Sequence, residues 1–380
     1  MEYLMLKEVC NINMGQSPDS SSYNKDGQGI PFFQGNADFG ERYPVARTWC
    51  NAPVKIANPS DILISVRAPI GALNYAKETC CIGRGLAAIT PDSKRVSSSY
   101  IYWLLKGKNV ELNSKGTGST FKAISRKALE EIKVPNISLE TQKQIAAILD
   151  KCTEIIAKRK AQFAALDELV KARFVEMFGD VEYNTKSWPI QTLDLLCSIG
   201  SSKRIYQNEQ TSEGIPFWRV SDLVSKMDNG FADSNLFISE KKYDELKQSG
   251  LVPVANDILV TSRGTLGRCY IIKEDDQFYF QDGMISWLSN YSEKITPLYL
   301  QYLFMMPDFR KQIDSMQAGS TVAYLSIAML KKLKVMVPSK ELQSDFSNFV
   351  SQVDKSKLAI QKSLEKTQLL FDSLMQEYFG

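Results

Sequence analysis

The sequence predicts an α+β fold that is built twice: two similar mixed domains, each followed by one long helix, related by an internal pseudo-two-fold symmetry. Two observations predict it. Short motifs of the 380-residue chain recur in the same order in residues 1–180 and 181–380. Each half also ends in about 40 residues that lack proline and glycine until a final glycine. A repeat of this length is a duplicated domain, because solenoid units are only about 20–50 residues long.

The motifs of the repeat are short, but their order does not change. They are Gly-Ile-Pro-Phe at 29–32 and 214–217, Asp-Ile-Leu at 61–63 and 257–259, Gly-Ser-Thr at 118–120 and 319–321, and Phe-Gly at 178–179 and 379–380. The offset between copies drifts along the chain, so the copies differ mainly by insertions in their first halves. The expected segments are a mixed domain at 1–138, a long helix at 139–180, a second mixed domain at 181–338 and a C-terminal helix at 339–380.

Inside the mixed domains, short β-rich runs are bounded by Gly, Pro, Asn and Asp, which is typical of strands between turns. We expect strands at 61–66, 85–90, 257–261 and 284–288. Apolar residues at helical spacing predict short helices at 98–106 and 297–305. One or two helical turns at 127–132 and 328–333 should lead into strands that stop at Pro135 and Pro338.

The long helices are expected at about 139–178 and 340–379, with Ser138 as the N-cap of the first. Their apolar residues follow a narrow 3–4 alternation, interrupted near Arg159 and at Lys357. Such a seam suits a coiled-coil partner, and two helices paired across a pseudo-two-fold must be antiparallel. The alternative is a pair of bent surface helices, each packed on its own domain.

Composition excludes several enzyme classes. The chain has no histidine, no Cys-x-x-Cys and no Gly-rich phosphate-binding motif, so we expect no catalytic residue, no metal and no cofactor. Its seven scattered cysteines suggest buried thiols in a reducing compartment. No apolar run approaches the length of a membrane span, and we expect no secretory signal. The net charge is only +3, so any nucleic-acid contact must use local patches.

Taken together, these blocks resemble the specificity subunit of type I restriction-modification systems. The resemblance rests on the Asp-Ile-Leu-x-x-x-Arg and Gly-Ser-Thr blocks, the following Val-Pro, and Leu-Glu-Thr-Gln-Lys-Gln-Ile-Ala-Ala-Ile-Leu-Asp at 139–150. It covers the whole chain. One departure is in the second copy, where 340–346 lacks the Gln-x-x-Ile of the first.

The resemblance implies a non-catalytic, cytoplasmic prokaryotic protein. Each half would be a target-recognition domain that reads one half of a bipartite site in double-stranded DNA. The long helices would separate the domains and hold two methyltransferase subunits, and restriction subunits would join the same assembly. Geometry leads to the same expectation, because a protein that reads a split site needs two domains at a fixed distance, and a pair of helices can set that distance.

Candidate DNA-binding residues combine base-edge donors with phosphate-binding loops. The Gly-Ser-Thr loops contribute hydroxyls and close backbone approach, although a helix-capping turn is an equal alternative. For Arg67 and Arg263 we favour a structural pairing with a buried carboxylate over DNA contact. Arg84 and Asp282 are taken as matching positions, most simply in variable loops. The full set is Gln34, Asn36, Arg67, Arg84, Lys115, Ser119, Thr120, Lys122, Arg126, Arg219, Asp222, Arg263, Ser320 and Thr321.

Candidate partner-binding residues lie on the helices and are expected to be exposed. They are Gln142, Lys143, Lys158 and Arg159 on the first helix, and Lys355, Gln361 and Lys362 on the second. Two rival functions stay open. One is a coiled-coil adaptor without DNA readout. The other is a metal nuclease that uses Pro91-Asp92 and Glu131-Ile132-Lys133, a short motif that the second copy lacks.

Overall fold

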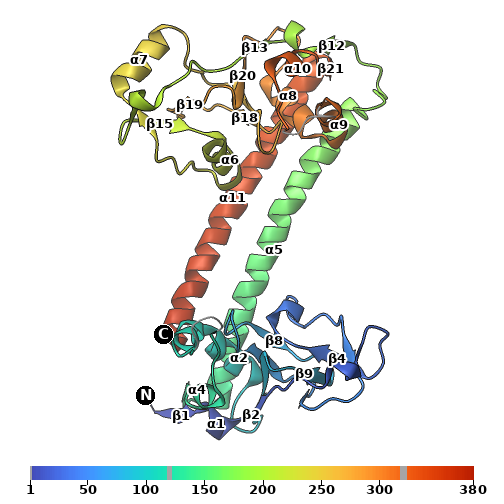
Figure 1. Cartoon of the computed structure of the whole chain (residues 1–380), viewed down its shortest axis with the longest axis vertical. Helices are drawn as coiled ribbons and strands as arrows, with labels where there is room; N and C mark the ends of the chain where they lie inside the picture. Colours follow the sequence, from blue (N-terminus) through green and yellow to red (C-terminus); the bar gives the residue numbers. More distant parts are fainter. Residues whose placement is uncertain (1, 118–121, 317–322) are drawn as a thin grey trace. The chain divides into compact units, whose positions relative to one another are not determined.

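The computed structural model describes residues 2–117, 122–316 and 323–380 (Figure 1). The order of elements repeats along the chain, which confirms the duplication. Each copy opens on a strand that pairs with the strand before its long helix. These antiparallel pairs are β1 (Tyr3–Met5) with β11 (Lys133–Pro135), and β12 (Ile190–Thr192) with β21 (Lys334–Met336).

The centre of each domain is a four-stranded antiparallel sheet with the same strand order in both copies. In the first copy the order is β2 (Cys10–Met14), β10 (Leu86–Pro91), β7 (Ile62–Ser65) and β8 (Leu73–Tyr75). In the second it is β13 (Ser198–Gly200), β20 (Ile285–Ser289), β17 (Ile258–Thr261) and β18 (Cys269–Ile271). The four strands expected from the sequence are the paired β7, β10, β17 and β20, so those expectations are confirmed.

A second sheet follows the Ile-Pro-Phe motif, and in each copy it contains one parallel pair. The first copy orders β3 (Tyr23–Asn24), β5 (Trp49–Cys50), β4 (Ile30–Phe33), β9 (Cys80–Ile82) and β6 (Ile56–Ala57). The second orders β14 (Gln210–Thr211), β16 (Phe237–Ile238), β15 (Ile215–Trp218) and β19 (Tyr279–Phe280). Helices α6 (Val220–Asn229) and α7 (Glu240–Gln248) belong to the second copy.

Short helices accompany the central sheets. The first copy has α1 (Leu6–Val9), α2 (Ser98–Gly107), α3 (Asn109–Ser114) and α4 (Arg126–Glu130). The second has α8 (Pro297–Met305), α9 (Pro307–Ser315) and α10 (Ile327–Lys331). Helices α2, α4, α8 and α10 lie at the expected positions, whereas α1, α3 and α9 were not expected. Single 3-10 turns are η1 (Ser20–Ser22), η2 (Asn36–Asp38), η3 (Leu193–Leu195) and η4 (Gln207–Glu209).

The long helices are α5 (Leu139–Phe178) and α11 (Lys340–Phe379), each of 40 residues. Both bounds agree with the expected ones. The Ser138 hydroxyl accepts a hydrogen bond from the Thr141 N–H at 3.1 Å, which confirms the N-cap. In α11 the Ser339 hydroxyl accepts from Leu342 N–H at 3.3 Å. Forty residues at 1.5 Å each give a length of about 60 Å.

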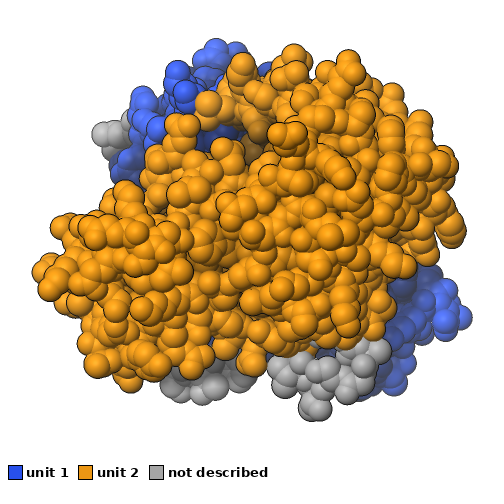
Figure 2. Space-filling model, turned by 90° about the horizontal axis from the view of Figure 1, so that it is seen from above, with its two compact units in different colours: residues 1–161, 361–380 blue, residues 162–360 orange. Residues whose placement is uncertain are grey.

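The chain forms two compact units (Figure 2). Each unit contains parts of both long helices. Unit 1 comprises residues 1–161 and 361–380, and unit 2 comprises residues 162–360. The sequence predicted a division by function, into two mixed domains and two long helices. That division stays a prediction.

The core of unit 1 takes side chains from the start of α5 and the end of α11. Ile145 and Leu149 are buried in it, and so are Phe371 and Phe379. Phe379 lies 5.3 Å from Tyr100 between ring centroids. A Cβ on Gly107 of α2 would lie 2.8 Å from the Cβ of Phe379, so this close approach requires glycine. Both helices therefore pack into a globular core as well as against each other.

The core of unit 2 takes the end of α5 and the start of α11. Phe174 lies 5.5 Å from Phe346 between ring centroids, and Phe178 lies 5.4 Å from it. Nearer the middle of the helices, Lys357 forms an ion pair with Asp167. Residues later in α5 therefore contact residues earlier in α11. Within this unit the two helices are antiparallel, as expected.

No helix in the described part of the chain is long and apolar enough to cross a membrane. All seven cysteines are free and buried, which confirms the expectation of buried thiols.

Candidate nucleic-acid interface

In the first domain, backbone hydrogen bonds bring four of the candidate segments together at the end of the central sheet where β7 ends and β10 begins. This end is called the sheet edge below. Gly85 N–H donates to the Gln34 oxygen at 3.1 Å, and Val66 N–H donates to the Gly85 oxygen at 2.9 Å. A Cβ on Gly85 would lie 2.3 Å from the Gln34 oxygen, so only glycine permits this approach. The segments that carry Gln34, Arg84 and Arg67 are thus adjacent.

The loop around 117–124 joins the same edge. Ile124 N–H donates to the Val66 oxygen at 2.9 Å, and Ala68 N–H donates to the Lys122 oxygen at 3.1 Å. Arg67 also forms an isolated bridge with Ala123. Ser119 and Thr120, the candidate phosphate contacts, lie outside the described residues. The backbone on both sides of them is nevertheless fixed beside Arg67.

The candidate side chains on this edge are mostly exposed. Gln34, Arg67, Arg84, Lys115 and Lys122 are exposed, and Asn36 is half-buried in η2. Lys115 pairs with Glu111 at 2.6 Å, one helical turn away. Exposed pairs of this kind contribute little to stability and remain available for other contacts.

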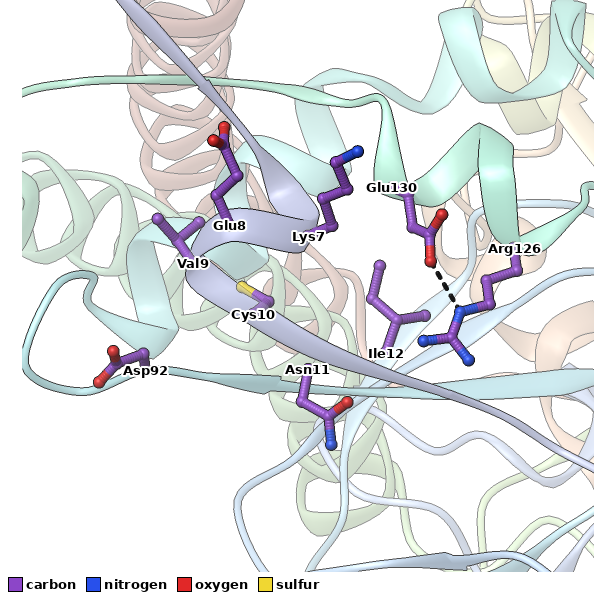
Figure 3. A pocket seen from close by; sticks show the side chains of 9 residues that line it. All are labelled: Lys7, Glu8, Val9, Cys10, Asn11, Ile12, Asp92, Arg126 and Glu130. Carbon is purple, nitrogen blue, oxygen red and sulfur yellow. Dashed lines mark hydrogen bonds and ion pairs between the residues drawn. The ribbon is translucent and has the colours of Figure 1, made fainter.

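Arg126 lies farther along, at the start of α4, and lines a pocket of about 330 Å³ (Figure 3). Its Nε donates to Glu130 Oε1 at 2.7 Å, and Lys7 and Asp92 are on the same lining. The Arg126 side chain is exposed and Glu130 is half-buried, so Arg126 retains donors for another acceptor.

The second domain repeats the backbone network. Ser262 N–H donates to the Met284 oxygen at 2.9 Å, and Leu325 N–H donates to the Ser262 oxygen at 3.0 Å. These bonds repeat those of Val66 and Ile124 in the first copy. Ser320 and Thr321 lie outside the described residues, as their counterparts do.

These backbone hydrogen bonds correct the expected match of Arg84 with Asp282. Met284 occupies the place of Gly85, so Gly283 matches Arg84, and Asp282 does not. A serine hydroxyl accepts from this position in both copies, although Ser17 and Ser201 are not equivalent in the repeat: Arg84 N–H donates to Ser17 Oγ at 3.3 Å, and Gly283 N–H donates to Ser201 Oγ at 3.1 Å. The strand pairing sets the register, and a single glycine in a loop could not reveal it.

Among the residues that the structure describes, neither Arg67 nor Arg263 pairs with a buried carboxylate, which corrects the favoured expectation. Both side chains are exposed, and the Arg263 guanidinium lies 5.4 Å from the ring centroid of Tyr324. The buried carboxylates of these blocks, Asp61 and Asp257, lie at the other end of the strand. They accept from backbone N–H groups of their own turns, at 2.8 Å and 3.0 Å.

Asp222 is also not a base-edge residue. Its side chain is 4% exposed, and its Oδ2 accepts from the Arg219 N–H at 2.8 Å, which caps α6. The half-buried Arg219 donates from Nε to Asp222 Oδ2 at 3.4 Å and from Nη2 to Asn235 Oδ1 at 3.2 Å. The cap consumes the carboxylate of Asp222, so only Arg219 stays a candidate here.

Arg204 is a candidate that the sequence reasoning missed. Its Nε donates to Asp282 Oδ2 at 2.8 Å, and this hydrogen bond raises the pKa of the Arg204 guanidinium. The run Ser-Ser-Lys-Arg at 201–204, just after β13, was the available signal. Its position beside Gly283 becomes evident only from the Ser201 contact.

Two of the expected partner-binding residues are structural. Gln142 is 2% exposed and bonded to backbone groups of its own domain, so its expected exposure is wrong. Arg159 is half-buried, and its Nη1 donates to the Ser363 oxygen at 2.6 Å and to the Thr367 hydroxyl. The interruption of the apolar seam near Arg159 is therefore a helix–helix contact.

The other five expected partner-binding residues leave polar groups near solvent. Lys158 pairs with Glu154 at 2.5 Å, and hydrogen bonds from Lys158 and Lys151 lower the pKa of Glu154 to about 2. The half-buried Gln361 donates to Glu365 at 2.8 Å. Exposed side chains are Lys143, Lys158, Lys355 and Lys362.

The residues of the possible nuclease motif are in ordinary surface contacts. Asp92 Oδ1 accepts from the Lys94 N–H at 3.1 Å, and Glu131 pairs with Lys127 at 3.7 Å. No cluster of His, Cys, Asp or Glu suited to a metal ion occurs among the described residues.

Comparison with known proteins agrees with this architecture. The family model described as the type I restriction modification DNA specificity domain matches residues 1–164 and 185–369. Two copies of one α+β domain, each with a long helix, define the class of protein. The chain belongs to the type I restriction modification DNA specificity domain family.

Named relatives are specificity subunits. The putative type I restriction enzyme MjaX specificity subunit of Methanocaldococcus jannaschii is 47% identical over 154 residues, which cover 40% of this chain and 36% of that protein. The MjaIX specificity subunit of the same organism is 24% identical over 399 residues, covering 97% of this chain and 90% of that one. The type I restriction enzyme EcoBI specificity subunit of Escherichia coli is 22% identical and covers 99% and 85%.

Two solved structures share the fold along the whole chain. One is the type I restriction-modification system S subunit from M. genitalium, with a TM-score of 0.61 and 17% identity, covering 100% of this chain and 96% of that one. The other comes from work on complex assembly and conformational transition of the type I R-M system, with a TM-score of 0.63, 14% identity and coverage of 100% and 97%.

Proposed function

We propose that this protein reads a bipartite site in double-stranded DNA and directs the methyltransferase and restriction subunits of a type I complex to that site. The proposal rests on one observation: the sheet edge beside Arg67 in the first domain recurs beside Arg263 in the second. The same backbone network presents one exposed arginine in each domain. Exposed guanidinium groups are suited to guanine edges and phosphates.

The two edges differ in their lining, which suits two different half-sites. The first carries exposed Arg84, Lys115 and Lys122 around Arg67. In the second, Arg204 is held by Asp282, and Arg263 stacks near Tyr324. A shared backbone with different side chains explains how one fold reads two sequences.

Partner binding is assigned to the exposed faces of the long helices. Leu169 is 47% exposed and Leu370 is 53% exposed, at the same position of the repeat. One exposed leucine is ordinary on a protein surface, but its recurrence at the same position of both long helices supports a protein partner. Two equivalent positions support two methyltransferase subunits per chain, with Lys143, Lys158, Lys355 and Lys362 on the same helices.

Partner binding is tested by stoichiometry. Leu169→Glu and Leu370→Glu should each reduce the number of bound methyltransferase subunits from two to one, measured by multi-angle light scattering. Ala172→Glu and Ser373→Glu place the same charge at matching exposed positions and should leave two bound. One partner on the unchanged chain would contradict the assignment.

Catalysis is assigned to the partners. Purified protein incubated with DNA, magnesium and S-adenosylmethionine should neither cleave nor methylate. Turnover that disappears on changing Asp92 or Glu131 would favour the nuclease instead.

DNA readout is tested by selection from a random DNA library, with and without the methyltransferase partner. The proposal expects enrichment of two short motifs at a fixed separation. Binding of the partner without any enriched motif would identify an adaptor that does not read DNA.

A further inference from the structure

Gln142, in the first turn of α5, binds three backbone groups of unit 1. Its Oε1 accepts from the N–H of Ser97, the N-cap residue of α2, at 2.9 Å. Its Nε2 donates to the Ile137 oxygen at 3.0 Å and to the Arg95 oxygen at 3.4 Å. The side chain is 2% exposed, so water cannot replace these bonds.

Gln343, in the first turn of α11, makes the same connections in unit 2. Its Oε1 accepts from Thr296 N–H at 2.8 Å and from the Thr296 hydroxyl at 3.1 Å, and Thr296 is the N-cap residue of α8. Its Nε2 donates to the oxygens of Lys294 and Pro338, each at 2.9 Å. This side chain is 0% exposed.

These glutamines do not cap their own helices. Ser138 and Ser339 accept the first-turn N–H bonds of α5 and α11. The glutamines instead bind the start of a different helix, α2 or α8, which packs on the central sheet. Each one therefore fixes the direction in which a long helix leaves its own domain.

We propose that Gln142 and Gln343 are positioning residues that set the half-site spacing accepted by the complex. The inference rests on the proposed function. If each long helix carries a recognition domain, a small change of angle at its first turn moves the far end of a 40-residue helix by several ångströms. When the amide donor and acceptor groups of the glutamine are all hydrogen-bonded, they hold that angle. Without these hydrogen bonds, the helix can leave its domain over a range of angles.

The test uses Gln142→Leu and Gln343→Leu, which keep the side-chain volume and remove the hydrogen bonds. Matched controls are Gln144→Leu and Gln352→Leu, because both glutamines are exposed on the same helices. Each full-length variant, in complex with methyltransferase, is given DNA in which the two half-sites are separated by the native spacer or by one base pair more or fewer. The readout is the ratio of methylation at the native spacer to methylation at the altered spacers.

The two Leu variants should reduce this ratio by about tenfold, through loss of buried hydrogen bonds. Their binding to DNA with a single half-site should match the unchanged protein, and the controls should keep the native ratio. A purely structural role would lower the melting temperature and leave the ratio unchanged, which would overturn the inference.

Gln142→Glu and Gln343→Glu provide a second series, because they keep the acceptor for Ser97 or Thr296 and lose the donors. They also set a carboxylate oxygen against the backbone carbonyl oxygens that the amide donated to, so they should reduce the ratio at least as much as the Leu variants. If both series fail to fold, the glutamines are structural and the inference is wrong. If the unchanged complex methylates without any preference for spacing, the proposed function fails first.

Discussion

Arg159 donates a hydrogen bond from Nη1 to the backbone oxygen of Ser363, 204 positions farther along the chain, at 2.6 Å. The same nitrogen reaches the Thr367 hydroxyl. In unit 2, Lys357 pairs with Asp167 and lies 5.6 Å from the Phe163 ring centroid. Both interruptions of the apolar seams are thus polar contacts between α5 and α11, which favour one register of the pair.

Replacing Arg159 with alanine should lower the free energy of unfolding by about 1–2 kcal/mol, because a half-buried charged hydrogen bond is lost. Lys160→Ala, at the exposed neighbouring position, should change it by no more than about 0.5 kcal/mol. Urea denaturation followed by circular dichroism measures both. Equal effects of the two substitutions would mean that the Arg159 contact contributes nothing.

Arg67→Ala and Arg263→Ala should each relax readout of one half-site only, by about 1–3 kcal/mol for a lost base contact. Lys133→Ala and Lys334→Ala are matched controls, since both are exposed and lie on the paired strands β11 and β21. Binding is measured against DNA libraries randomised in one half-site at a time. An effect of Arg67→Ala on both half-sites would argue against separate readers.

The role of Ser119 and Thr120 as phosphate contacts is predicted from the sequence alone. Changing both to alanine should weaken binding to all DNA sequences alike, because phosphate contacts carry no sequence information. Titrations against specific and random DNA, at several salt concentrations, measure the effect. A change of sequence preference with unchanged affinity would show that the assigned role is wrong.

Residues 1–180 alone should form an antiparallel homodimer. Without residues 361–380, the core of unit 1 loses Phe371 and Phe379. Val170 and Phe178 of α5 match Phe371 and Phe379 in the repeat. A second copy of the truncated chain can therefore place its Val170 and Phe178 where Phe371 and Phe379 are missing. Exposing this seam disfavours the monomer.

With methyltransferase, this truncated chain should direct methylation to a palindrome that repeats the half-site of residues 1–138. Phe178→Asp should abolish the dimer in analytical ultracentrifugation. An asymmetric methylated site, or a soluble monomer of the unchanged truncation, contradicts the duplication argument.

The thiols should be unreactive in the native protein. Burial raises the pKa of Cys10 and Cys197 to about 12 each, from 9.0, so these thiols stay protonated where an unfolded thiol ionises. Iodoacetamide at pH 8 should label seven cysteines only after denaturation. Because the unfolded state releases these protons first, stability should fall as the pH rises from about 9 towards 12.

Much of the fold was predictable from the sequence, because the duplication lets each half support the other. Strands β7 and β17 and both long helices are where their patterns place them. The two-residue strands β3 and β6 were not predicted, because their pairing partners lie far away in the sequence and two residues carry no periodicity.

The candidate site was harder to predict. Gln142 continues the 3–4 spacing of Ile145, Leu149 and Cys152 backwards, and Gln343 does the same for Phe346 and Val350. That spacing indicated burial, but polarity suggested an exposed face. Asp222 was misread because its Arg-x-x-Asp cap lacks the usual Ser or Thr.

Sequencing of methylated DNA from cells that contain this chain and a methyltransferase partner tests the central claim most directly. The expected result is one asymmetric bipartite motif with a fixed spacer, in which Arg67→Ala relaxes one half and Arg263→Ala relaxes the other. A single uninterrupted motif, or a motif that both substitutions alter in the same half, would contradict it.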